Sequence, residues 1–275
     1  MSVKKEASGR RSVQVELEVP GTPEEVWQAI ATGPGISSWF VPCEFEEQDG
    51  KPVAIKLKFG PGMEPRSALT AWDPPRRFVA QGEGWGGAPP IATEWSVEVR
   101  GGGMCRIRIV QSLFASTDEW DNQLEGAKGA FSGFLRTLQL YLTHFRGQRA
   151  ANMQLVAAAA GTEAAAWETL TAALGVKGVS VGQRFTAPAG VAPLSGVMEY
   201  VTESPYDALL RLDKPGPGIA ALGAYTFPGG DQTMVVMGFY LYGEQAAGTV
   251  ARVTPLWQAW LQERFPMPTA QSNSK

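Results

Sequence analysis

The first part of the chain alternates apolar and polar residues and then changes to a helical spacing. Over residues 13–19, valine and leucine alternate with glutamine and glutamate, which predicts a strand with one buried face. The next stretch, GTPEEVWQAIATGPGISSWF at residues 21–40, opens with threonine, proline and glutamate in the order that caps a helix. We therefore expect a strand followed directly by a short helix that begins after Thr22.

Alternating segments continue to residue 111 and predict an antiparallel meander. Asp49-Gly50 is typical of a tight hairpin turn, and three glycines at 101–103 reverse the chain before the last strand. The expected strands are 53–59, 67–72, 77–82, 93–99 and 105–111. Because no helix separates these strands, the order favours an antiparallel sheet over a βαβ arrangement.

From residue 118 onward, the apolar residues recur at spacings of three and four. They are Leu124, Ala127, Phe131, Phe134, Leu135, Leu138, Leu142 and Phe145. This spacing predicts a helix of about 25 residues, ~38 Å long, which can lie across a curved sheet and bury one stripe. Gly126, Gly129 and Gly133 each cost about 1 kcal/mol relative to alanine, so we interpret them as close approaches to the sheet or as room for a ligand.

The second half of the chain repeats this order of elements. Thr162 and Trp167 have the same spacing as Thr22 and Trp27, and residues 153–159 alternate as residues 13–19 do. Further expected strands are 194–201, 208–212, 220–227 and 233–242, and the expected terminal helix lies within 245–265. A counterpart of the 42–60 hairpin is missing. We therefore predict two domains, 1–148 and 152–268, of which the second is shorter.

Two segments carry a resemblance to a known family. PEEVWQAIATGPGISSWF at 23–40 and LEGAKGAFSGFLRTLQLYLTHFRG at 124–147 resemble the signature of proteins similar to the activator of the heat-shock-protein-ninety ATPase, within the START-like helix-grip (SRPBCC) superfamily. A tryptophan common in that family after the helix glycine is replaced here, since Ala130 and Phe131 follow Gly129. The resemblance implies an α+β helix-grip fold, in which a curved antiparallel sheet surrounds a long C-terminal helix with a hydrophobic cavity between them. With the repeat, it implies two tandem copies, the second reduced.

Composition and charge exclude several classes of partner. Hydrophobic residues make up 44% of the chain, charged residues 19%, and the net charge is −3, as in globular proteins with a substantial core. The one basic cluster, Lys4, Lys5, Arg10 and Arg11, is interpreted as a solvated tail and not as a nucleic-acid-binding arm. No apolar run approaches the ~20 residues of a membrane-spanning helix. We expect neither a nucleic acid nor a membrane as partner.

The two cysteines, Cys43 and Cys105, cannot form a disulfide framework and have no second cysteine or histidine close in sequence to suggest a metal site. No apolar core of a signal peptide opens the chain. A reduced, cytoplasmic protein without metal or cofactor is therefore expected.

No catalytic centre is visible in the sequence. The only histidine, His144, lies near the predicted end of the long helix, where an imidazole suits the helix C-terminus. Neither GxSxG nor GxGxxG is present, and the glycine-rich stretch 82–87 continues into a loop and not into a helix. These observations favour a non-enzymatic role and no catalytic residue is assigned.

The aromatic residues are the remaining signal, with nine Trp, twelve Phe and six Tyr. Our candidate ligand-binding residues are those expected to line the interior of the first domain: Trp39, Phe40, Trp72, Phe78, Trp85, Trp95, Phe131, Phe134 and Leu138. The alternative is that they simply fill a core. Arg106, Arg108, Glu94 and Gln111 are polar candidates, although strand alternation places both arginines opposite Ile107 and Ile109. The loop 82–90 with Trp85 is either a lid or an ordinary hairpin tip.

Three functional hypotheses follow. The first is non-enzymatic binding of a small hydrophobic or lipid-like ligand in a helix-grip cavity. The resemblance implies the second, a co-chaperone-like module that docks on a chaperone or another protein in a stress response. The third is an enzyme similar to the polyketide aromatase/cyclases, some of which also carry two grip domains. Monomer and homodimer are both open.

Overall fold

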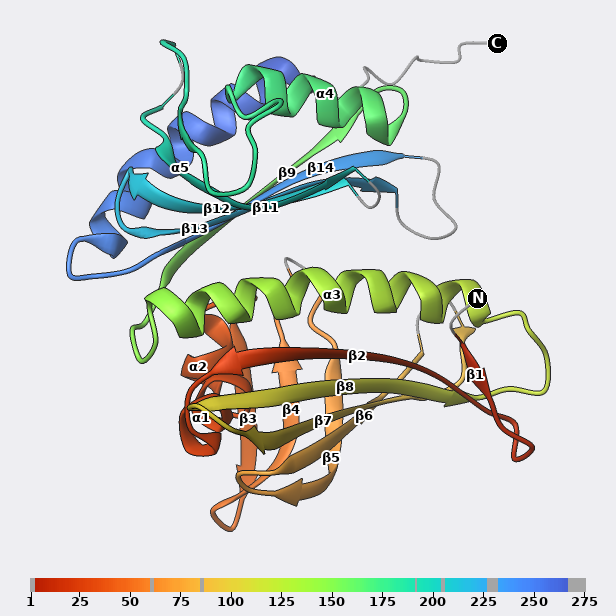
Figure 1. Ribbon diagram of the computed structural model, residues 1–275. Helices are drawn as coiled ribbons and strands as arrows, with labels where there is room; N and C mark the ends of the chain where they lie inside the picture. Colours follow the sequence, from red (N-terminus) through yellow and green to blue (C-terminus); the bar gives the residue numbers. More distant parts are fainter. Residues whose placement is uncertain are drawn as a thin grey trace, which may run out of the picture. The chain divides into compact units, whose positions relative to one another are not determined.

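The computed structural model describes residues 3–59, 62–84, 87–190, 192–203, 206–226 and 232–266. The chain forms two compact units, Met1–Arg149 and Ala150–Lys275. Each unit contains one antiparallel sheet followed by a long helix at its C-terminal end (Figure 1). The predicted α+β fold, with two tandem helix-grip copies, is confirmed.

The first unit is built on an eight-stranded sheet in the order β1-β2-β8-β7-β6-β5-β4-β3. The strands are β1 (Lys4–Lys5), β2 (Arg10–Pro20), β3 (Cys43–Gln48), β4 (Lys51–Leu57), β5 (Arg66–Asp73), β6 (Arg77–Gly82), β7 (Ile91–Arg100) and β8 (Met104–Phe114). From β3 to β8 each strand pairs with the one that follows it, as the meander predicted. The pairing of β2 with β8 then joins the N-terminal strand to the last one.

Helix α1 (Pro23–Ile30) begins as the sequence predicts. The Thr22 hydroxyl accepts a hydrogen bond from the Glu25 N–H at 3.3 Å, and the Glu25 carboxylate accepts one from the Thr22 N–H at 2.8 Å. The five-residue helix α2 (Gly33–Ser37) was not predicted. A Cβ on Gly35 would lie 1.9 Å from the Gln28 carbonyl oxygen, so only glycine lets the two short helices pack at this angle.

Helix α3 (Asp121–His144) covers one face of this sheet, which we call the inner face (Figure 1). Leu124 of α3 packs against Val13, Ile91 and Leu113, which fixes the face on which alternate residues of β2, β7 and β8 lie. On these three strands and on β6, the inner-face residues are uncharged except Arg11.

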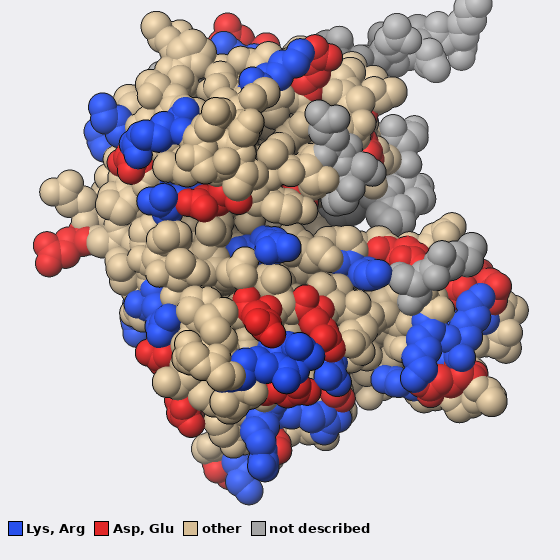
Figure 2. Space-filling model, in the orientation of Figure 1, with Lys and Arg blue, Asp and Glu red and all other residues tan. Residues whose placement is uncertain are grey.

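The opposite, outer face carries the charged residues of the same strands. Arg108 contacts Glu16 at 2.8 Å and Glu98 at 3.1 Å, and the Arg106 guanidinium lies 3.6 Å from Glu16. In the view of Figure 2, basic and acidic side chains are interspersed without a large surface of one sign. Such pairing leaves no basic stripe on this face that would attract a nucleic acid.

The N-terminal basic cluster is not the solvated tail that the sequence suggested. Lys5 belongs to β1, which pairs with β2, and Arg11 is only 6% exposed. The Arg11 guanidinium donates hydrogen bonds to Asp118 and Asp121, both at 2.7 Å, and the Lys5 ammonium lies 2.9 Å from Asp121. The cluster therefore ties the first strands to the beginning of α3.

The second unit is a reduced copy of the first, as predicted. Its sheet has the order β10-β11-β12-β13-β14-β9, with strands β9 (Ala151–Ala159), β10 (Arg184–Thr186), β11 (Ser195–Glu203), β12 (Tyr206–Lys214), β13 (Gly218–Thr226) and β14 (Thr233–Leu241). In this order β9 corresponds to β2 and the three-residue β10 to β4. No strand of the described part corresponds to β3.

Helices α4 (Glu163–Ala173) and α5 (Ala246–Arg264) cover one face of the second sheet (Figure 1). Thr162 caps α4 by accepting a hydrogen bond from the Ala165 N–H, as Thr22 caps α1. Pro255 lies inside α5 and does not start it.

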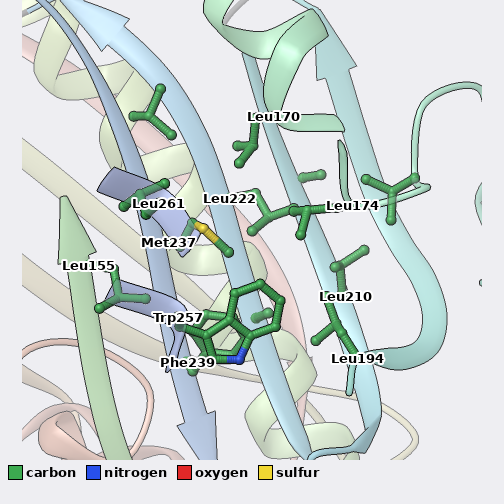
Figure 3. Close-up of a cluster of buried hydrophobic side chains, with 14 of the residues drawn as sticks. Leu155, Leu170, Leu174, Leu194, Leu210, Leu222, Met237, Phe239, Trp257 and Leu261 are labelled. Carbon is green, nitrogen blue, oxygen red and sulfur yellow. The ribbon is translucent and has the colours of Figure 1, made fainter. Parts of the chain in front are cut away.

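Helices α4 and α5 and the second sheet enclose a filled core of aliphatic and aromatic side chains (Figure 3). The labelled side chains are Leu155, Leu170, Leu174, Leu194, Leu210, Leu222, Met237, Phe239, Trp257 and Leu261, all at most 4% exposed. These side chains leave almost no accessible surface for a ligand to cover. Among the described residues of the chain, no helix is long and apolar enough to span a membrane.

Candidate functional site

Three strands of the first unit place aromatic rings side by side on the inner face. Trp72 of β5 lies opposite Phe78 of β6, and Phe78 lies opposite Trp95 of β7. Their ring centroids are 5.8 Å and 6.1 Å apart, so the strand register alone builds a row of three rings. All three are candidates from the sequence.

Helix α3 extends this row across the space above the sheet. Phe131 lies 6.5 Å from Trp95 in an edge-to-face arrangement, and Phe134 follows at 6.3 Å from Phe131. Phe134 in turn contacts Phe40, which comes after α2, at 4.3 Å. The rings therefore form a continuous series from the sheet to the helix, which we call the aromatic series.

The remaining candidates have different positions. Trp39 stacks on Phe40 at 5.6 Å, and its indole N–H donates a hydrogen bond to the Ala29 carbonyl oxygen at 2.9 Å. Leu138 is fully buried on α3. Trp85 lies outside the described residues. The candidates that the structure describes thus come from the sheet, the α2 segment and α3.

Sequence reasoning missed three aromatic residues that join the series. Trp27 of α1 lies 5.1 Å from Trp72, Phe45 of β3 lies 5.7 Å from Trp72, and Phe59 lies 5.7 Å from Phe40. Trp27 could have been included, because it lies on the apolar stripe of the helix that follows the first strand. Phe45 sits in an acidic segment without clear alternation.

Burial divides the candidates into two groups. Trp39, Phe78 and Leu138 are at most 2% exposed and belong to the core. The other five described candidates are only partly buried: Phe40, Trp72, Trp95, Phe131 and Phe134. Rings that touch one another and yet remain accessible leave ring surface that a ligand can cover, whereas a filled core would bury them completely.

The middle of α3 supports this distinction. None of its residues from 125 to 134 is buried, although Leu124 and Leu135 at the two ends of this stretch are each 1% exposed. A Cβ added to Gly129 would meet nothing within 4 Å, so this glycine does not mark a close approach to the sheet. Helix α3 is therefore anchored at both ends of a ten-residue span that is itself loosely covered.

The polar candidates are sorted by strand alternation. Arg106 and Arg108 lie on the outer face, and so does Glu94, which pairs with Arg77 at 2.6 Å. Gln111 lies on the inner face, where its side-chain amide donates a hydrogen bond to the Thr93 hydroxyl at 3.3 Å. Thr93 and Gln111 are directly opposite each other between the Leu124 anchor and Trp95.

A third uncharged polar group lies on the same helix face as the aromatic residues of α3. Gln123 precedes Ala127 by four residues and Phe131 by eight, which places all three on one face. Its side-chain carbonyl oxygen is buried and accepts no hydrogen bond from any described residue. A buried acceptor of this kind is unfavourable unless a water or a ligand group donates to it.

The two cysteines and the histidine are poorly suited to nucleophilic or acid–base catalysis at the aromatic series. Burial raises the pKa of the Cys43 thiol to about 12, and burial also raises the pKa of Cys105, so both thiols are protonated at neutral pH. His144 is exposed in the last turn of α3. In the described ranges, no three His, Cys, Asp or Glu side chains gather as a metal would require. The arrangement can hold an apolar molecule and offer it neutral hydrogen-bonding groups.

Comparison with known proteins relates the first unit to one broad family. The family described as "Polyketide cyclase / dehydrase and lipid transport" matches residues 10–142. No curated protein sequence matches the chain. The narrower resemblance to the ATPase activators remains a prediction.

Several solved structures are similar in fold. The di-domain ARO/CYC protein BexL from the BE-7585A biosynthetic pathway is 12% identical, covering 93% of this chain and 96% of that one, with a TM-score of 0.45. DynU16, from the dynemicin biosynthetic locus, is 16% identical over 92% and 93%, with a TM-score of 0.42. The Aha1 dimer of Colwellia psychrerythraea is 20% identical over 50% and 98%, with a TM-score of 0.39. Over residues 10–142, the chain thus matches the polyketide cyclase/dehydrase and lipid transport family.

Proposed function

We propose that the first unit binds a small, uncharged and mainly apolar molecule between the inner face of its sheet and α3. The observation that carries this proposal is the aromatic series, whose rings contact one another and remain partly accessible under a span of α3 without a buried residue. A ligand in this space would cover the exposed ring surfaces. At ~25 cal/mol per Å², covering about 300 Å² of apolar surface contributes roughly 7 kcal/mol before the entropy cost of binding.

The polar groups narrow the class of ligand. Thr93, Gln111 and Gln123 carry hydroxyl and amide groups, which recognise a neutral hydroxyl or carbonyl group and give no compensation to a buried charge. Inner-face residues of β2, β6, β7 and β8 are uncharged apart from Arg11, which is already paired with two aspartates. A charged molecule would therefore lose hydration without gaining a partner.

Non-enzymatic binding accounts for the site better than turnover does. The matching family includes cyclases and dehydrases, whose chemistry requires proton transfer to or from the substrate. Amides and hydroxyls orient a substrate, but at neutral pH they are poor proton acceptors. We therefore favour storage, transport or delivery of the bound molecule.

Native mass spectrometry of the purified protein, compared with the denatured chain, tests the proposal. We expect a co-purifying neutral species of defined mass, or, after stripping, saturable binding of 2-naphthol followed by tryptophan fluorescence. The proposal is wrong if the protein is empty and neither 2-naphthol nor naphthalene changes its fluorescence or melting temperature. A pull-down of protein partners would then test the docking hypothesis.

A further inference from the structure

A cavity of the first unit lies at the sheet edge beside β3. It has a volume of about 480 Å³ and opens between the α1–α2 connection and β3. Its lining includes Trp27, Cys43, Glu44, Phe45, Glu47 and Trp72. We call it the edge cleft. Its volume is sufficient for a small organic molecule.

Three aromatic rings form one side of the edge cleft. Trp72 lies 5.1 Å from Trp27 and 5.7 Å from Phe45, with interplanar angles of 66° and 65°. Trp27 is only 6% exposed, whereas Trp72 and Phe45 are partly accessible. An organic cation is attracted to an accessible ring face when it lies within about 6 Å of the ring centroid.

The charge of the cleft has one sign. Its lining includes two carboxylates, Glu44 and Glu47, and no lysine, arginine or histidine. Glu44 pairs with Lys58, whereas Glu47 forms no ion pair with any residue in the described ranges. The unpaired carboxylate therefore leaves the cleft with a net negative charge.

Strand alternation places the Glu47 carboxylate on the aromatic side. Cys43, Phe45 and Glu47 are alternate residues of β3, and all three line the cleft. The pairing of β3 with β4 contains a bulge, and its extra residue, Val53, lies on β4. The alternation along β3 is therefore unbroken. Glu46, on the other face, is bound by Arg66 at 2.7 Å.

We infer that the edge cleft is a binding site for a small organic ammonium ion, held against the partly accessible rings of Trp72 and Phe45 and neutralised by Glu47. A methylated ammonium group suits this site because its apolar surface contacts the rings while its charge is spread toward them. A metal ion does not suit it, because the other ligands in the lining are Glu44, which is already paired with Lys58, and the protonated thiol of Cys43. Trp72 belongs both to the aromatic series and to the lining of this cleft, whereas Glu47 belongs to the cleft alone.

Comparing the affinities of choline and its neutral isostere 3,3-dimethylbutan-1-ol separates the contribution of the ligand's charge to binding from that of its shape. Titrations of the full chain, followed by the indole N–H resonances of Trp27 and Trp72, are expected to give about tenfold tighter binding of choline. Raising the salt concentration from 20 to 300 mM shortens the Debye length about fourfold. We therefore expect the affinity for choline to fall and the affinity for the isostere to stay unchanged. Equal affinities for the two molecules would overturn the inference.

Two matched variants test the role of the unpaired carboxylate. Glu47→Gln is expected to lower the affinity for choline about fivefold and to leave the affinity for the isostere unchanged. Glu46→Gln is the control, because it removes the same charge from the opposite face of β3. Its affinity for choline is expected to stay within twofold of the wild type. Because both side chains are exposed, neither variant should impair folding. If the two variants weaken choline equally, or if neither does, the site is not the edge cleft. Binding of 2-naphthol to each variant without choline reports separately on the site under α3, because neither Glu46 nor Glu47 belongs to the aromatic series.

Discussion

The rings of Phe40 and Phe134 lie 4.3 Å apart between their centroids. Phe40 follows the short helix α2, and Phe134 occupies the last turn of the loosely covered span of α3. This contact therefore joins the α1–α2 segment to the long helix at one end of the proposed binding space. Because both rings are only partly buried, they can contact a ligand as well as each other.

A comparison of Phe134→Ala with Phe78→Ala distinguishes a residue that lines the proposed binding space from a residue of the core. Phe134 is partly buried, so we expect its loss to cost about 1–2 kcal/mol of unfolding free energy and to weaken 2-naphthol at least fivefold. Phe78 is 1% exposed, and its truncation is expected to cost roughly 3–5 kcal/mol. Urea unfolding measures both. If Phe134→Ala is as destabilising as Phe78→Ala and leaves 2-naphthol binding unchanged, Phe134 belongs to the core.

The pair Thr93 and Gln111 predicts selectivity for a hydrogen-bonding group. In the double variant Thr93→Val with Gln111→Leu, both partners of one hydrogen bond are replaced by apolar groups of similar size, so stability should change by less than about 1 kcal/mol. Affinity for 2-naphthol should fall about tenfold, and affinity for naphthalene should stay the same or rise. Isothermal titration of both probes makes the comparison; equal losses for the two would contradict the assignment of these groups.

Much of the fold could be predicted because its local signals agree with its tertiary structure. The capped start of α1, the alternation in β2 and the spacing of α3 each depend on residues that are close in the sequence. The same alternation correctly placed Arg106 and Arg108 on the face opposite Ile107 and Ile109. The register that sets Trp72 beside Phe78 and Phe78 beside Trp95 depends on pairing between strands, which no local pattern specifies.

What could not be predicted depends on contacts between distant residues. Arg11 and Asp121 are 110 positions apart, and only the packing of β2 against α3 shows that Arg11 is buried and paired with two aspartates. Likewise, Glu47 looks like one of several acidic residues in residues 42–50, and its distinct position appears only when Arg66 and Lys58 are seen to neutralise Glu46 and Glu44. Partners of charged residues are therefore the least predictable part of the site.

The filled core of the second unit predicts that ligand binding resides in the first. Leu210→Ala removes a fully buried side chain of the second core and is expected to cost about 2–5 kcal/mol. Affinity for 2-naphthol, measured under conditions where the variant is folded, should be unchanged. Leu138→Ala is the matched control, since Leu138 is equally buried on α3 and its loss should affect both stability and affinity. A fall in affinity caused by Leu210→Ala would place a binding site in the second unit.

The ion pair between Arg11 and Asp121 predicts a specific pH dependence of stability. A hydrogen bond from Lys5, together with the Arg11 guanidinium, lowers the pKa of the Asp121 carboxyl below its ordinary value. The folded pKa is thus lower than the unfolded value of about 3.9, so the unfolded state takes up a proton first as the pH falls. The stabilisation is complete above about pH 5 and is lost as the pH falls through 3.9 toward the folded pKa.

Asp121→Asn should therefore lower the melting temperature most at pH 6–7, and the difference from the wild type should shrink steadily toward pH 3. Both proteins are compared by thermal unfolding in one buffer series at constant ionic strength. Asp49→Asn, in the exposed β3–β4 turn, removes the same charge without breaking an ion pair among the described residues and is expected to follow the wild type at every pH. If the difference between the wild type and Asp121→Asn is constant from pH 7 to pH 3, the carboxylate of Asp121 does not stabilise the attachment of α3 through its charge. The buried pair would then act only through hydrogen bonds that an amide can also make.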